Sequence, residues 1–282
     1  MESPLPATSS LPSSDFSKTA IVAVNTTVLY LLAYFLVQGV YQLATLRMAA
    51  RLGIPGVWQL GQIQFRIADT EWWRTGVLAV YGIGPVACAG LGMVAGWWFW
   101  QRARYRRGLF KQFLLWVMLH AANLSLGVFV ADTLTQSGAW YVPSWLFLVG
   151  NVLNVVVALL AGIVQVGLGY LASIAFLHSH DSITLMRFQN RRRLLLCSVL
   201  VPWLVGSLLL TLLYWPRQSL SEQLHGIVML LLLGPLYLAS MQESFEGTIR
   251  QPSRTQLAVS LLLLLAVVAI GWRLVLSKGI TF

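Results

Sequence analysis

Apolar runs long enough to cross a bilayer recur along this chain, and they limit its fold more than any other feature. Of its 282 residues, 57% are hydrophobic and only 10% are charged, whereas soluble domains carry about 25% charged residues. About 20 apolar residues cross a bilayer as a helix, because backbone groups in lipid must be satisfied within the segment. The sequence therefore predicts an all-α polytopic membrane protein with about seven transmembrane helices.

The predicted organisation is a Ser/Pro-rich tail over residues 1–18 and a single helical membrane domain over residues 19–282. The tail has few apolar residues and cannot bury a core, so we expect it to be disordered. The fourth span is longer than a bilayer requires, and we interpret it as one long helix that tilts or projects into the cytoplasm. The expected spans are residues 20–44, 75–100, 112–133, 145–177, 194–214, 225–241 and 257–276.

The segment between the first two spans has a different pattern. Over residues 57–67, apolar side chains such as Trp58 and Phe65 alternate with polar ones such as Gln64, with a slip of phase at Gly61. Alternation with a period of two is typical of a strand. We therefore expect a short β-ribbon at the membrane surface near residues 57–67.

The net charge of +10 comes largely from basic residues in short loops beside apolar runs, at 102–111 and 187–193. This is the usual topology signal, and no basic domain stands apart to bind nucleic acid. We expect an integral protein of the plasma or inner membrane with its amino terminus in the cytoplasm, and its partners to be the lipid bilayer or another membrane protein. Four arginines in residues 47–74 fall on the opposite side, so either the ribbon re-enters the membrane or the span count is off by one.

Polar side chains within the third and fourth spans are the main candidates for a site. His120 and Asn123 lie three residues apart and share a helix face, and Asn151 and Asn154 repeat that spacing in the next span. We expect the four to form a polar cluster, which either fixes helix packing or binds a ligand or metal. Asp132 follows Asn123 by about 900° of helix rotation, so we expect it to face away and to be structural.

A metal site has only scattered candidates. Imidazole and carboxylate groups ligate metals, and these groups occur at His120 and in the sequence HSHD, at His178, His180 and Asp181. The HSHD cluster lies where a helix meets a basic loop, a place where exposed polar groups are expected. The chain has no HExxH, GxSxG or P-loop motif, and its sequence identifies no cofactor.

The order of segments in residues 20–100 resembles the membrane-embedded zinc metallopeptidases of the site-2 protease type (M50-like). In that family a helix with HExxH precedes a surface β-ribbon and a helix entered through an A-G-P-like segment. Here the first span precedes WQLGQIQFRI and YGIGPVACAGLG, but the position of HExxH reads QGVYQ, residues 38–42. Asp132 is followed by Thr, not by the Gly of the family's Asp-Gly ligand segment. The resemblance implies a degenerate relative without the hydrolytic zinc site, and no catalytic residue carries over.

These observations favour a non-catalytic multi-pass membrane protein, a scaffold or a binder of a partner protein or lipid. One alternative is a membrane-embedded metal-dependent enzyme that uses the face with His120 and Asn123. Another is a small-solute transporter, with the GIGP segment of the second span and the fourth span lining a path. A proton-coupled transporter usually carries a carboxylate within a span, and this sequence shows none except at Asp132.

Overall fold

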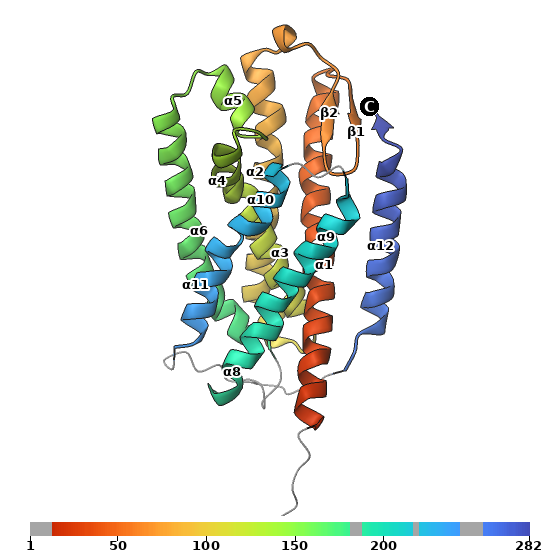
Figure 1. The fold of residues 1–282 in the computed structure, drawn as a ribbon, viewed down its shortest axis with the longest axis vertical. Helices are drawn as coiled ribbons and strands as arrows, with labels where there is room; N and C mark the ends of the chain where they lie inside the picture. The colour runs from red at the N-terminus through yellow and green to blue at the C-terminus, as the bar shows by residue number, and fades with distance from the viewer. Residues whose placement is uncertain (1–12, 181–187, 217–219, 243–255) are drawn as a thin grey trace, which may run out of the picture.

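The computed structural model describes residues 13–180, 188–216, 220–242 and 256–282, which are mostly α-helical (Figure 1). In this part of the chain, seven helical segments are long and apolar enough to cross a membrane. They are Lys18–Arg51, Arg74–Tyr105, Phe110–Thr135, Asn151–Ser179, Asn190–Tyr214, Leu220–Ser240 and Val259–Ser277. The predicted fold class, an all-α polytopic membrane protein with about seven spans, is confirmed.

The spans are of two kinds. Four are built on one α-helix, namely α1 (Ser13–Arg51), α2 (Arg74–Gln101), α6 (Asn151–Ser179) and α12 (Val259–Ser277). Three consist of two helices in line, namely α3 (Phe110–Ala122) with α4 (Val128–Thr135), α8 (Phe188–Leu195) with α9 (Val201–Tyr214), and α10 (Leu220–Val228) with α11 (Leu230–Ser240). The first two joins are π-helical turns, Asn123–Gly127 and Leu196–Leu200.

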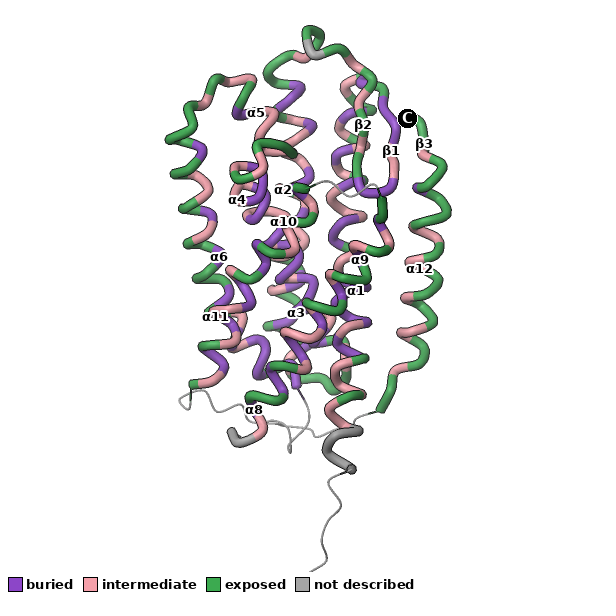
Figure 2. The backbone as a smooth tube through the Cα atoms, in the orientation of Figure 1, coloured by how far each residue is buried: buried purple, intermediate pink, exposed green. Residues whose placement is uncertain are grey.

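Helix α1 is the centre of the bundle and packs against α2, α3, α9 and α12. Figure 2 shows burial concentrated along α1 and α3, whereas α12 is largely exposed along its length. On the other side of the molecule α6 pairs with α11. Their backbones touch at Gly169, where an added Cβ would lie 2.2 Å from the carbonyl oxygen of Leu232.

The structure differs from the expected boundaries most clearly in the fourth span and at the start of the first helix. The fourth span is not one helix over 145–177, because the chain breaks between a short helix α5 (Tyr141–Leu146) and α6, with Leu148 at a φ of +52°. Helix α1 begins at Ser13, inside the segment expected to be disordered, and residues 1–12 lie outside the described residues. Extending an existing helix adds a hydrogen bond per residue without a new nucleation step, which favours the longer helix.

The predicted ribbon is confirmed as an antiparallel hairpin of β1 (Gly56–Trp58) and β2 (Ile63–Phe65). The slip of phase at Gly61 is its turn, where Gly61 has a φ of +90° and Gln59 N–H donates to the Gln62 carbonyl at 2.9 Å. A third strand that the sequence did not indicate, β3 (Ile280–Thr281), pairs with β1 and gives the order β2-β1-β3. A strand of two residues is too short to show alternation.

The hairpin folds back along α1 instead of lying flat beyond its end (Figure 1). The side chain of Gln42 donates to the Gly61 carbonyl at 3.4 Å and accepts from the Trp58 indole at 3.0 Å. Gln42 lies nine residues before the end of α1 at Arg51, about 14 Å along the helix. The ribbon therefore returns toward the centre of the bundle.

Candidate functional site

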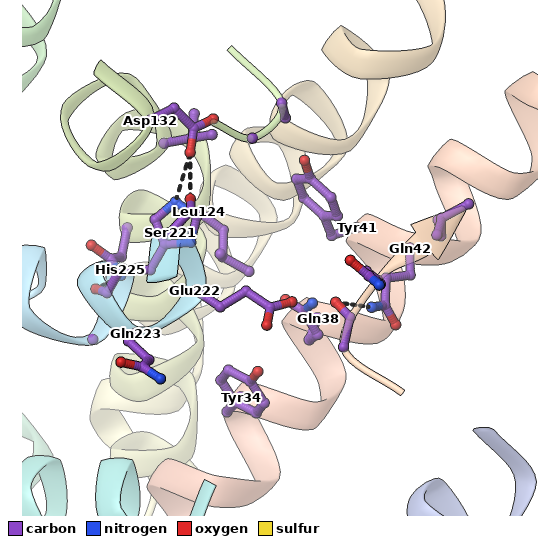
Figure 3. Close-up of a pocket in the computed structure, with 18 of the residues that line it drawn as sticks. Tyr34, Gln38, Tyr41, Gln42, Leu124, Asp132, Ser221, Glu222, Gln223 and His225 are labelled. Atoms are coloured by element: carbon purple, nitrogen blue, oxygen red, sulfur yellow. Dashed lines mark hydrogen bonds and ion pairs between the residues drawn. The ribbon is translucent and has the colours of Figure 1, made fainter. Parts of the chain in front are cut away.

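A polar cavity of about 590 Å³ lies within the bundle, where the hairpin turn and α10 approach α1 and α4 (Figure 3). Helix α1 contributes a polar and aromatic stripe with helical spacing, which is one face of the helix. That stripe consists of Tyr30, Tyr34, Gln38, Tyr41, Gln42 and Thr45. The cavity size is in the range of small-molecule sites, about 300–1,000 Å³.

Asp132 is fully buried at one end of this cavity. Its carboxylate accepts hydrogen bonds from the Ser221 hydroxyl at 2.6 Å and from the Trp140 backbone N–H at 2.8 Å. The Nε2 atom of His225 is 3.7 Å from the carboxylate oxygen Oδ1 (Figure 3). The carboxylate is thus held by three neighbours from α10 and the loop after α4.

The expectation that Asp132 faces away from Asn123 is wrong, since both side chains line the same cavity. The reason is the π-helical turn Asn123–Gly127 between them. A π-helical turn accommodates one extra residue. This reduces the effective separation of Asn123 and Asp132 from nine residues to eight. Eight residues of regular helix rotate by about 800°, so the two side chains point only about 80° apart.

Glu222 brings a second carboxylate to the cavity from α10. Its side chain reaches across toward α1 near Gln38 (Figure 3). A Cβ added at Gly61 would lie 3.3 Å and 3.4 Å from the two carboxylate oxygens of Glu222. The carboxylate therefore packs over the hairpin turn, and the glycine at position 61 leaves room for it.

His120 lies in the wall of the cavity among aromatic rings. Its ring centroid is 4.5 Å from that of Tyr30, 5.7 Å from that of Tyr34 and 6.1 Å from that of Trp116. The residue is only 3% exposed, and its Nε2 atom is buried with no hydrogen-bond partner among the described residues. A buried ring nitrogen without a partner is costly unless a ligand or water satisfies it.

Asn123 forms a bridge, although not to the asparagines expected. Its amide donates to the His225 carbonyl at 2.8 Å, and its Oδ1 accepts from Gln165 of α6 at 3.3 Å. Asn151 is exposed and Asn154 is buried, but neither lines the cavity with His120 and Asn123. The partner of Asn123 in α6 is Gln165, which lies eleven residues beyond Asn154, about 16 Å along the helix. Helices α6 and α3 therefore meet at a different level than the short connection between the two spans suggested.

Neither His178 nor His180 of the HSHD sequence lines the cavity. His178 is exposed, with Nδ1 2.8 Å from the Ile174 carbonyl in its own helix. His180 is buried, with Nε2 3.1 Å from the Ser198 hydroxyl and Nδ1 3.1 Å from the Ser179 hydroxyl. Asp181 lies outside the described residues. Among the residues that are described, no group of three His, Cys, Asp or Glu side chains has the geometry to hold a metal ion.

The described residues that line the cavity include two carboxylates and no lysine or arginine side chain. The chain has 19 Lys and Arg residues, yet none of the described lining residues is Lys or Arg, whereas Asp132 and Glu222 are both present. Low-dielectric walls concentrate the field of charged groups in a cleft.

Sequence reasoning singled out His120 and Asn123 but missed most of this site. The α1 stripe was visible as Tyr and Gln residues recurring every three or four positions in an otherwise apolar run. Ser221, Glu222 and His225 recur on one short amphipathic helix, at a spacing that also marks a helix face. The contribution of the hairpin turn had no such signal, because it depends on how the ribbon folds back. Comparison with known proteins gives no match, whether to a family model, a curated protein or a solved structure.

Proposed function

We propose that this protein is a non-catalytic multi-pass membrane protein that binds a small organic cation in the polar cavity. The observation that carries this proposal is a cavity of about 590 Å³ with two carboxylates and, among its described lining residues, no lysine or arginine. A buried carboxylate interacts far more strongly with a cation than one in water does, because the surrounding dielectric is low. A ligand of this class would gain most from the site.

The aromatic residues of the wall support the same ligand class. Tyr30, Tyr34 and Tyr41 of α1 and Tyr81 of α2 all line the cavity. The faces of aromatic rings attract cations, by about 0.5–2 kcal/mol for each well-placed ring. Amide groups of Gln38 and Gln42 add hydrogen-bonding capacity for a polar substituent.

The arrangement does not resemble a nucleophilic hydrolase. In a catalytic triad a histidine lies between the serine and the carboxylate, accepting the serine proton. Here the Ser221 hydroxyl donates directly to Asp132, and His225 approaches the same carboxylate oxygen from 3.7 Å. The serine proton therefore points to a carboxylate and not to a histidine, so these three residues lack the order of a catalytic triad.

The test is a binding assay on the detergent-purified protein by isothermal titration. Choline and its uncharged isostere 3,3-dimethyl-1-butanol form the reference pair, followed by a panel of primary amines with their neutral counterparts. We expect binding of the cation to exceed that of its isostere by about tenfold or more. Equal binding of a cation and its neutral counterpart would contradict the proposal. So would a failure to bind any cation in the panel.

Matched glutamate variants locate the site. Glu222→Gln removes a charge from the cavity, and we expect it to weaken cation binding by about tenfold. Glu71→Gln removes a charge from an exposed position at the end of the turn Asp69–Glu71 and should leave binding unchanged. If the two variants behaved alike, the cation would be binding elsewhere.

A ligand-binding cavity of this kind serves either a receptor or a solute transporter. Helix α2 continues through Pro85 of the GIGP segment without interruption, and α6 reaches the cavity only indirectly, through the bond from Gln165 to Asn123. Neither feature of the transport path that the sequence suggested lines the cavity. Uptake of a bound cation into liposomes, compared with empty vesicles and with Glu222→Gln, separates the two roles.

A second candidate function, a metal-dependent membrane enzyme, is favoured by one observation. The Nε2 atom of His120 is buried in the cavity wall without a partner among the described residues, one turn from Asn123. Metal content of the purified protein, measured by mass spectrometry for wild type and His120→Ala, tests this. About one equivalent of zinc or iron that is lost in the variant would support the enzyme, whereas no metal in either protein would remove it.

The distant relationship to site-2-protease-type peptidases is also a proposal. It is supported by the order α1, β1–β2 hairpin, α2, and by the position of Pro85 inside α2. The same order places Gln38 and Gln42 of α1 in the cavity, where the family's first helix carries its HExxH motif. A relative of this kind would retain the cavity with different chemistry, which agrees with a role in binding.

A cytoplasmic amino terminus is the orientation we propose. The start of α1 and the basic residues 102–107 lie at one end of the molecule, and the hairpin and the carboxyl terminus lie at the other (Figure 1). Labelling intact cells with a membrane-impermeant maleimide tests this, with Arg106→Cys at the first end and Arg66→Cys, an exposed position directly after β2 of the hairpin, at the second. Only Arg66→Cys should be labelled, and labelling of Arg106→Cys alone would reverse the orientation.

A further inference from the structure

A second cavity, distinct from the polar one, opens on the outside of the bundle. It is a groove of about 690 Å³ with walls from α2 and α6 and a floor from α3. The two cavities share no lining residue and lie on different faces of α3, since His120 and Asn123 line the polar cavity whereas Leu119 and Ala122 line the groove. The groove is therefore a separate site from the polar cavity.

The groove is long, narrow and apolar. On α2 it extends from Pro85 to Trp100, fifteen residues or about 22 Å of helix. Small side chains at Ala89 and Ala172 in the walls and at Ala122 in the floor leave the groove open. Its length exceeds one leaflet of the hydrocarbon core, which is about 15 Å or half of the 30 Å bilayer. A shape of this kind fits one extended acyl chain.

The end of the groove at Trp100 is strongly basic. The guanidinium of Arg104 lies 5.3 Å from the Trp100 ring centroid, and Arg102, Arg106 and Arg107 are exposed in the same loop. The loop is fixed to the bundle, because Ala103 is buried and the turn Ala103–Tyr105 packs against α2, α3 and α6. The sequence has no acidic residue between Glu71 and Asp132. The groove thus opens onto a positive surface held in place.

We infer that the groove is a binding site for one anionic phospholipid, with an acyl chain between α2 and α6 and the phosphate at the arginine loop. Charge complementarity identifies this occupant, because the bilayer supplies chains to any apolar groove but only an anionic headgroup gains from the arginines. Each basic residue near an anionic headgroup contributes about a fivefold gain in affinity. Arginine also binds phosphate through two parallel hydrogen bonds.

The experiment is native mass spectrometry of the full-length protein released from nanodiscs. The discs contain equal amounts of phosphatidylglycerol and phosphatidylcholine with identical acyl chains. We expect one retained phospholipid, with phosphatidylglycerol preferred over phosphatidylcholine. The double variant Arg106→Gln/Arg107→Gln should reduce that preference by about 25-fold, or about fivefold per arginine. Arg192→Gln/Arg193→Gln, a matched pair of exposed arginines in α8, should leave the preference unchanged.

A second set of variants tests the groove itself. Ala122→Phe fills the floor and should abolish the retained lipid, while Ala266→Phe on the exposed face of α12 should not. If Ala122→Phe fails to fold, as judged by its thermal unfolding, Ala172→Phe from the opposite wall replaces it. Equal retention of the two lipids, retention of lipid in the filled variant, or a dimer of the chain in place of the lipid adduct would each overturn the inference.

Discussion

Ser221 donates a hydrogen bond of 2.6 Å to the Asp132 carboxylate and thereby joins α10 to the end of α4 inside the bundle. The loop after α4 closes on the same carboxylate through the Trp140 N–H. Gly138 permits this approach, because its φ is +100° and a Cβ there would lie 2.3 Å from the Asp132 oxygen Oδ1. Asp132 therefore connects α4 to the loop that follows it and to α10, which is distant in the sequence.

Ser221→Ala removes one donor from this buried carboxylate. Loss of a hydrogen bond to a charged, buried group costs about 1–3 kcal/mol, and we expect the free energy of unfolding to fall by that amount. The measurement is denaturant unfolding in detergent, followed by circular dichroism. Ser277→Ala is the control, since its exposed hydroxyl bonds the Leu274 carbonyl of its own helix. A loss no larger than that of the control would show that Asp132 does not depend on Ser221.

Asn123 and Gln165 should be energetically coupled, because they form a side-chain hydrogen bond of 3.3 Å between α3–α4 and α6. Hydrogen bonds between membrane helices contribute about 0.6 kcal/mol on average and about 1.7 kcal/mol at most. A double-mutant cycle of alanine substitutions at both positions should give a coupling energy in this range.

The same cycle with Asn123 and Asn154 serves as the control. Asn154 is the partner that the sequence spacing indicated, but it lines no part of the cavity with Asn123. Its coupling energy with Asn123 should be close to zero, because distant residues act additively. A larger coupling with Asn154 than with Gln165 would contradict the register of α6 against α3.

The class of the fold and the positions of the helices were predictable because hydropathy alone determines them. Span boundaries agreed to within a few residues where an apolar run ends at charged side chains, as at Arg74 and Arg102 at the two ends of α2. They failed at residues 141–150, where an apolar sequence contains a chain reversal without a charge to mark it. Irregular backbone in such a segment depends on tertiary contacts, which periodicity does not report.

The candidate site was less predictable for a physical reason. Its composition depends on the registers between helices, and on the π-helical turn that turns Asp132 toward Asn123. Regular helix geometry places that carboxylate on the wrong side. The fold-back of the hairpin, which brings Gly61 under Glu222, is likewise a tertiary effect. The helix faces that line the site, such as the α1 stripe, were visible in the local sequence, but how these faces meet was not.

Gln42 should hold the hairpin against α1. Its side chain bonds both the Trp58 indole and the Gly61 carbonyl, so Gln42→Leu removes two hydrogen bonds of about 1 kcal/mol each. Amide hydrogen exchange over residues 56–65 should become about 30-fold faster, because local opening costs correspondingly less. Gln64→Leu, an exposed change in β2, is the control. Equal exchange in the two variants would show that other contacts fix the hairpin.

Gly169 and Gly167 provide a sharp test of how α6 packs. A Cβ at Gly169 would lie 2.2 Å from the Leu232 carbonyl oxygen, whereas a Cβ at Gly167 would meet nothing within 4 Å. Gly169→Ala must therefore push α6 away from α11, and overpacking of this kind costs about 1–3 kcal/mol. Gly167→Ala gains helix propensity without a clash and should stabilise the protein by up to about 1 kcal/mol.

Unfolding of the two glycine variants, measured side by side in the same detergent, gives changes of opposite sign if the backbones touch as the structure shows. The comparison is demanding because both substitutions add one methyl group to the same helix, two residues apart. General effects of alanine on α6 or on detergent binding would move both proteins in one direction. A shared direction of change would mean that α6 and α11 are not in contact at Gly169, and the α6 register that brings Gln165 to Asn123 would lose its support.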